Sequence, residues 1–218
     1  ACASVEWKEL LPKTRLKPGY EQTRMHYFPF DLPQEDESAS AGAKNVVIGT
    51  HLRVNYYPDG GVARFRVWGH PIETVVRRLG KAYSPIRTGR TCTVVSHSES
   101  SENASFIMPS RQPYPDPELS AEMNGGVGLM CSNKHYGEPW QLIQTSLGRD
   151  MGDGWETARH PERPAVLVKN PETDLVDNNL NDWCILQLGS VAGQGITRII
   201  LDTRHFRGNY PESVHLGG

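Results

Sequence analysis

Two runs rich in polar and aromatic residues hold the side chains best suited to chemistry. The first spans 153–157 (DGWET) and the second spans 202–211 (DTRHFRGNYP). Asp153 and Glu156 offer carboxyl groups for proton transfer. His205 offers an imidazole whose ordinary pKa of about 6.5 suits proton transfer near neutral pH. Because loops at strand ends commonly carry function, we expect a site where these two runs meet.

The elements that must position these runs have the pattern of β-strands. Apolar and polar residues alternate over 52–56 and again over 63–67, which predicts two half-buried strands. Arg64 and Arg66 share one face of the second strand, and we interpret them as ordinary side chains of a solvated face. Between the strands, 58–61 (PDGG) has the residues of a tight turn, so the two strands are predicted to form a hairpin.

Two further runs, 183–188 and 196–201, are short and apolar and predict more deeply buried strands. Sustained helical periodicity is scarce. Antiparallel strands with turns at short spacing favour an all-β sandwich or jelly roll, in which two sheets each bury one face. A barrel is the alternative that this pattern leaves open.

Composition excludes several classes of partner. The formal net charge is −2 and the charged residues are spread along the chain, so no basic stripe is available to bind nucleic acid. No run reaches the roughly 18 apolar residues of a membrane span, and the first residues lack a signal-peptide pattern. The sequence therefore predicts a soluble, cytoplasmic protein with no nucleic-acid or membrane partner.

The residues that most often bind metals are also poorly placed for it. The four cysteines lie far apart and include no C-x-x-C pair, which argues for reduced thiols and against a zinc ribbon; they are Cys2, Cys92, Cys131 and Cys184. Histidines and carboxylates show no metal-ligand spacing. We predict neither a metal nor another cofactor.

Four motifs together resemble allantoicases. They are the runs at 52–61 (LRVNYYPDGG), 153–157, 182–189 (DWCILQLG) and 202–211. The resemblance covers nearly all of the chain, and the opening at 7–14 (WKELLPKT) is similar to the family segment that precedes the first motif. It implies a galactose-binding-like jelly-roll β-sandwich, which this family carries as two tandem repeats.

Here the motif at 52–61 comes before the other motifs, whereas within one family repeat its counterpart follows them. By this resemblance, residues 1–76 are similar to the C-terminal half of a first repeat and residues 125–218 to the N-terminal half of a second. Residues 77–124 are rich in serine and proline and are interpreted as a linker. Two hypotheses follow: the halves complement one another as a permuted sandwich, or a second copy or separate fragment supplies the missing strands.

The resemblance implies hydrolysis of allantoate to ureidoglycolate and urea, a step of purine (allantoin) degradation. It also implies a homo-oligomer, in the cytoplasm or, as an open alternative, the peroxisome. A non-catalytic sandwich that binds a small ligand, or an inactive fragment of the enzyme, is the rival interpretation. Allantoate is a small carboxylate with two ureido groups, so its site needs a cation, amide partners, an acid and a base.

Site residues are assigned on that basis, each beside a structural alternative. Glu156, His205 and Asp153 are the catalytic candidates, although Asp153 is equally suited to stabilise a turn. Arg159 is the candidate for the substrate carboxylate, because a guanidinium fork binds two oxygens at once. The remaining candidates for lining the pocket are Thr157, Trp155, Asn209, Tyr210 and His135. Packing is the alternative for Trp155.

Overall fold

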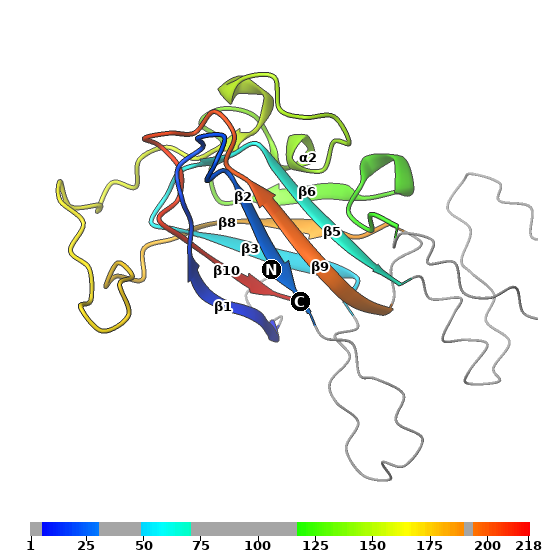
Figure 1. The fold of residues 1–218 in the computed structure, drawn as a ribbon, viewed down its shortest axis with the longest axis horizontal. Helices are drawn as coiled ribbons and strands as arrows, with labels where there is room; N and C mark the ends of the chain where they lie inside the picture. The colour runs from blue at the N-terminus through cyan, green and yellow to red at the C-terminus, as the bar shows by residue number, and fades with distance from the viewer. Residues whose placement is uncertain (1–5, 31–48, 71–116, 190–193) are drawn as a thin grey trace, which may run out of the picture.

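Strands dominate the described part of the chain, and they form two facing antiparallel sheets (Figure 1). The computed structural model describes residues 6–30, 49–70, 117–189 and 194–218. One sheet has five strands in the order β1 (Glu9–Arg15), β10 (Ser213–Gly217), β3 (His51–Tyr57), β8 (Asp182–Gln187) and β6 (Val127–Cys131). The other has three, in the order β2 (Met25–Pro29), β9 (Gln194–Asp202) and β5 (Arg64–His70).

Short elements complete the described structure. A two-stranded pair joins β4 (Gly61–Val62) to β7 (Trp155–Glu156). The helical elements are the four-residue α2 (Pro139–Leu142) and the single 3-10 turns η2 (Glu122–Asn124) and η3 (Met151–Asp153). The fold is therefore all-β, as predicted. It is a sandwich and not a closed barrel, because each described sheet ends in edge strands.

The two halves of the sequence interleave in both sheets. β3 lies between β10 and β8, with Asn55 opposite His215 on one side and opposite Trp183 on the other. In the second sheet β9 lies between β2 and β5. Strands from before residue 70 and after residue 117 thus build one sandwich jointly. The proposed boundaries at 76 and 124 stay predictions, because residues 71–116 lie outside the described part.

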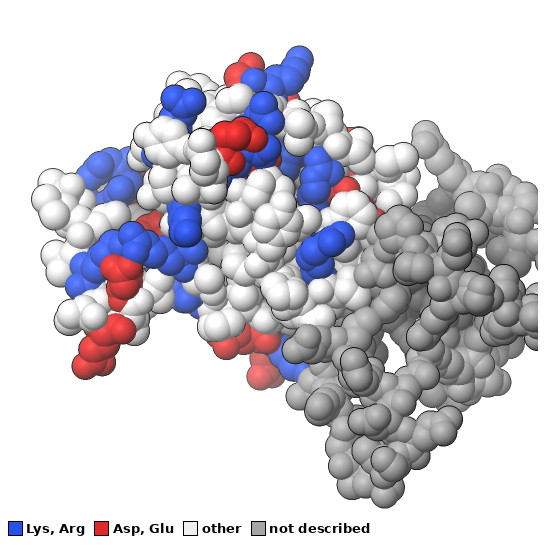
Figure 2. Space-filling model, in the orientation of Figure 1, with Lys and Arg blue, Asp and Glu red and all other residues white. Residues whose placement is uncertain are grey.

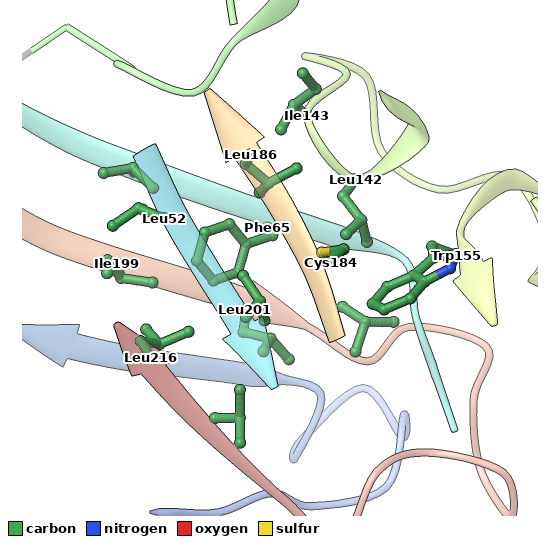
Figure 3. Packing of buried hydrophobic residues seen from close by; sticks show 14 of the residues in the cluster. Leu52, Phe65, Leu142, Ile143, Trp155, Cys184, Leu186, Ile199, Leu201 and Leu216 are labelled. Atoms are coloured by element: carbon green, nitrogen blue, oxygen red, sulfur yellow. The ribbon is translucent and has the colours of Figure 1, made fainter. Parts of the chain in front are cut away.

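The core lies between the inner faces of the two sheets (Figure 3). From β3, Leu52 and Val54 are completely buried, which confirms the alternation predicted for 52–56. They belong to one cluster with Phe65 of β5, Ile199 of β9 and Leu186 of β8. Burying each such side chain contributes about 1.5–3 kcal/mol, so the cluster holds the sheets face to face.

The predicted hairpin is wrong. β3 pairs with β10 and β8, while β5 pairs with β9 in the other sheet, so residues 58–61 carry the chain across the sandwich. Gly60, with φ of 141°, is packed so closely that an added Cβ would lie 2.6 Å from the carbonyl carbon of Tyr210. Alternation identifies a strand with one buried face, but it does not identify the partner strand, and here both strands bury their apolar face in the same core.

A second expectation also needs correction. Arg64 was expected on a solvated face, yet it is only 1% exposed. The outward face of β5 is covered at this point by residues 146–153, which accept hydrogen bonds from the Arg64 guanidinium. Arg66, further along β5, remains closer to solvent and pairs with Glu118 at 2.9 Å.

Candidate functional site

Three chain segments meet at one end of the sandwich. Glu156 of β7 pairs with Gly61 of β4, and the Gly61 amide donates to the carbonyl of Asn209 at 2.8 Å. The next residue, Thr157, donates its amide to the carbonyl of Gly60 at 3.0 Å. The crossing segment at 58–61 therefore lies between the two polar runs and holds both of them.

Glu156 and Asn209 make a direct side-chain contact between these runs. The Asn209 Nδ2 donates to Glu156 Oε1 at 2.6 Å, and the carboxyl group is partly exposed. On its other side, the Glu156 amide donates to the carbonyl of Tyr136 at 2.8 Å, and the Glu156 carbonyl accepts from the amide of His135 at 3.1 Å. His135 is exposed, and its ring lies edge-on to Tyr136 with centroids 4.4 Å apart. Glu156 thus joins three segments.

His205 takes an unusual backbone conformation at this same end. Its φ is 73°, and its ring Nε2 lies 2.9 Å from the carbonyl oxygen of Gly148. A carbonyl oxygen only accepts hydrogen bonds, so Nε2 must carry a proton. In the neutral ring, Nδ1 is then the atom that can accept a proton. The following residue, Phe206, is fully buried and fixes this segment to the core.

Asp153 is held by arginines. Its Oδ2 lies 3.0 Å from Arg64 Nη2, 3.1 Å from the Arg149 amide and 3.3 Å from Arg149 Nε. Burial by itself raises the pKa of Asp153, but the hydrogen bonds from Arg149 and Arg64 outweigh it and hold that pKa below its usual value. The Asp153 carboxylate is therefore charged and occupied by protein partners, which suits a positioning role.

Arg149 and Arg159 present exposed guanidinium groups near these runs. Arg159 is exposed, and its Nη2 donates to the carbonyl of Pro164 at 3.1 Å. Arg149 is 83% exposed, is tethered through Nε to Asp153, and directly follows the Gly148 carbonyl that holds His205. Sequence reasoning missed Arg149, although its position four residues before Asp153 was the available signal.

Other predicted residues have packing or bracing contacts. Trp155 is completely buried, lies 4.8 Å from the Tyr56 ring, and donates its Nε1 to the carbonyl of Asn133 at 3.0 Å. Thr157 is 4% exposed, and its Oγ1 accepts from the Gly60 amide at 3.0 Å. Tyr210 is partly buried against the core cluster. These side chains shape the loops.

Within the described ranges, no group of three or more His, Cys, Asp or Glu residues could hold a metal ion, and no helix is long and apolar enough to cross a membrane. Basic and acidic side chains are interspersed on the face shown in Figure 2. An open pocket elsewhere contains none of the predicted site residues; it is lined by Glu122, Met123, Gln144, Thr145 and Ser146.

Comparison with known proteins agrees with the motifs. The family model described as the allantoicase repeat matches residues 1–72 and 117–218. The allantoicase of Neurospora crassa is 35% identical over 167 residues, which cover 77% of this chain and 33% of that protein. Probable allantoicases of Stutzerimonas stutzeri and Pseudomonas fluorescens are 33% and 32% identical over 96% and 99% of this chain. No solved structure matches the chain.

The first matched segment ends just after β5, and the second begins at residue 117, where the described residues resume before η2. The matches to the two bacterial proteins span 43% and 44% of their lengths, so the chain spans less than half of the curated relatives that it matches. With both halves of the sandwich covered by one family model, the chain belongs to the allantoicase family.

Proposed function

We propose that this chain takes part in the hydrolysis of allantoate to ureidoglycolate and urea, with its site at the meeting point of β7 and the segment 203–211. Support comes from the family and from relatives named allantoicase or probable allantoicase. The observation that carries the position of the site is the 2.6 Å hydrogen bond between Glu156 and Asn209, which brings a partly exposed carboxyl group from one polar run onto the other.

The reaction sets clear chemical demands. Water adds a hydroxyl group to the carbon that bears the two ureido groups, the bond from that carbon to one ureido nitrogen breaks, and the nitrogen takes a proton to leave as urea. One group must accept a proton from water and another must supply one to the leaving nitrogen. We assign these roles to Glu156 and to Nδ1 of His205, whose Nε2 is engaged with Gly148.

The substrate carboxylate needs a cation. Arg149 and Arg159 both offer exposed guanidinium groups that can bind two oxygens. Arg149 is the stronger candidate, because its tether to Asp153 fixes its stem beside the His205 segment. Asn209 and His135 are proposed to bind the ureido groups. Asp153 is proposed to position Arg149, and Trp155, Thr157 and Tyr210 to shape the loops around the substrate.

Urea release from allantoate by the purified chain tests this proposal. Glu156→Gln should lower kcat by about 10²–10⁴-fold, the usual contribution of a positioned acid or base, while Glu162→Gln, an exposed carboxyl six residues away, should leave it unchanged. Arg149→Gln should raise KM more than Arg159→Gln. No urea from an intact sample would refute the activity of this chain. Calorimetric binding of allantoate without turnover would favour the binding-module interpretation.

Assembly and location are part of the same proposal. We propose that the chain associates with a second copy or a complementing fragment, since it spans less than half of its relatives, and solution mass measurement tests this. The described cysteines, Cys131 and Cys184, are free thiols, as expected in a reducing compartment such as the cytoplasm. Imaging of the tagged protein would check that location.

A further inference from the structure

Cys131 and Cys184 lie directly opposite one another on neighbouring strands. Cys131 ends β6 and is the register partner of Cys184 in β8. The amide of Ser132, one residue after Cys131, donates to the carbonyl of Trp183, one residue before Cys184, at 2.8 Å. A hydrogen bond in this flanking position marks the two cysteines as a non-hydrogen-bonded pair, the narrower kind of antiparallel pair.

This geometry suits a disulfide. Cα atoms of a non-hydrogen-bonded pair lie about 4.5 Å apart, and disulfides join Cα atoms about 4.4–6.8 Å apart. Residues opposite each other across a ladder point to the same face of the sheet. Cys184 belongs to the buried core cluster and Cys131 packs against that cluster, so both thiols are on the inner face.

The surroundings give one thiol access to solvent and the strand room to adjust. Cys184 is completely buried and lies among core side chains in Figure 3, whereas Cys131 is only partly buried. β6 is an edge strand with β8 as its partner, and its register shifts between Gly128 and Met130. An edge strand with such an irregularity can shift when the bond closes.

We propose that Cys131 and Cys184 form a reversible cross-strand disulfide when the protein meets hydrogen peroxide. The Cys131 sulfur attacks the peroxide, its O–O bond breaks, and Cys131 becomes a sulfenic acid while water leaves. The Cys184 sulfur then attacks the Cys131 sulfur, the S–O bond breaks, and a second water leaves as the S–S bond forms. In total, two thiols are oxidised and one peroxide is reduced to two waters.

Both thiols are protonated in the resting protein. Burial raises the pKa of Cys131 and raises that of Cys184 well above the usual value. The thiolate is the reactive form, so oxidation by the peroxide is slow in comparison with a dedicated peroxidase. The pair is therefore a modification site that responds to sustained oxidation, and a thiol reductant converts the disulfide back to two thiols.

The disulfide would act on the loop that leads into the candidate site. Residues 132–138 follow Cys131, and within them the Asn133 carbonyl accepts from Trp155 and the Asn133 side chain accepts from the amide of Ala158 at 2.9 Å. This loop begins where β6 ends. A covalent link to β8 therefore keeps the end of β6 from separating from β8. Amide exchange of residues 132–136 should slow several-fold in the oxidised protein.

The test uses the full chain and a Cys2→Ser/Cys92→Ser variant, in which Cys131 and Cys184 are the remaining cysteines. After treatment with hydrogen peroxide and alkylation of free thiols, peptide mass spectrometry should find the two cysteine peptides linked, with the loss of two hydrogen atoms and recovery by dithiothreitol. In Cys131→Ser, Cys184 should remain a reduced thiol, because its burial keeps the oxidant away.

Several results would overturn the proposal. They are oxidation of Cys131 to a sulfinic acid with Cys184 still reduced, a link from Cys131 to another chain or to Cys2 or Cys92, and a Cys131–Cys184 link that forms only in denaturant. Linked protein whose amide exchange over 132–136 is unchanged would refute the proposed action on the loop. These readouts do not depend on urea release, so they are independent of the proposed activity.

Discussion

Replacing Asp153 by asparagine tests whether this residue supports the site by binding Arg64. The Arg64 side chain is 1% exposed and that of Asp153 8%, and their nitrogen and oxygen lie 3.0 Å apart. Removing one charge of such a buried pair leaves the other uncompensated and typically costs about 3–5 kcal/mol. Asparagine can still accept one hydrogen bond, and Arg64 keeps the carbonyl of Ser146 at 2.7 Å. We therefore expect a loss of about 3 kcal/mol, at the low end of that range.

Urea denaturation followed by tryptophan fluorescence measures this loss. With a slope of about 3 kcal/mol per molar urea, the midpoint should fall by about 1 M. The matched control is Arg15→Gln, which breaks the ion pair with Asp174 whose side chains are 51% and 61% exposed. That change should cost less than about 1 kcal/mol. If Asp153→Asn destabilises the protein no more than Arg15→Gln, the bracing role of Asp153 is refuted.

The loss of stability caused by Asp153→Asn should depend on pH. The folded-state pKa of Asp153 lies below its usual value of about 3.9, so the carboxylate stabilises the fold at pH values above about 4. As pH falls through the folded-state pKa, the carboxylate is protonated and its contribution is lost. The stability difference between the native chain and Asp153→Asn should therefore be full at neutral pH and should shrink in acid below about pH 4.

Two further predictions concern the core. The Tyr56 hydroxyl is buried and has no hydrogen-bond partner among the described residues, so Tyr56→Phe should leave stability unchanged or raise it by about 1 kcal/mol in urea denaturation; a loss above about 1 kcal/mol would reveal a missed partner. Burial lowers the pKa of His26, whose Nε2 accepts from the Lys17 amide at 2.8 Å. Stability should therefore decline as pH falls below about 6.5, and His26→Gln should remove that part of the decline. If stability depends on pH in the same way in His26→Gln as in the native chain, the prediction for His26 is wrong.

Local pattern was enough to find most of the central strands, but it did not give their pairing. The runs 52–56 and 196–201 lie within β3 and β9, and the run 183–188 covers β8 except its first residue and extends one residue past its end. Alternation and short apolar runs report which faces are buried. The predicted hairpin failed because the partners of β3 are distant in sequence: Asn55 pairs with His215 and with Trp183. Such pairings depend on how the whole core is filled, which no short window contains.

The candidate site shows the same division. The two polar runs were identified from residue types, and the structure brings Glu156 and Asn209 into contact. The sequence did not indicate which carboxyl group would be bound by other protein side chains. Asp153 binds Arg64, 89 residues earlier in the chain, whereas Glu156 stays partly exposed. The spacing of Arg149 and Asp153 was visible in the sequence, but the contact between their side chains depends on the turn η3, which contains Asp153.

Arg64 explains why the sandwich and the candidate site are linked. The segment 146–153 has no long helix or strand to pair its backbone carbonyls, so they need other hydrogen-bond donors. The Arg64 guanidinium has five N–H donors in a rigid plane, and it binds the carbonyls of Ser146 and Leu147 together with the Asp153 carboxylate. Gly148, whose carbonyl holds His205, lies between these contacts. A core strand therefore fixes the loop that orients the imidazole, which is why an arginine on the outward face of β5 is buried.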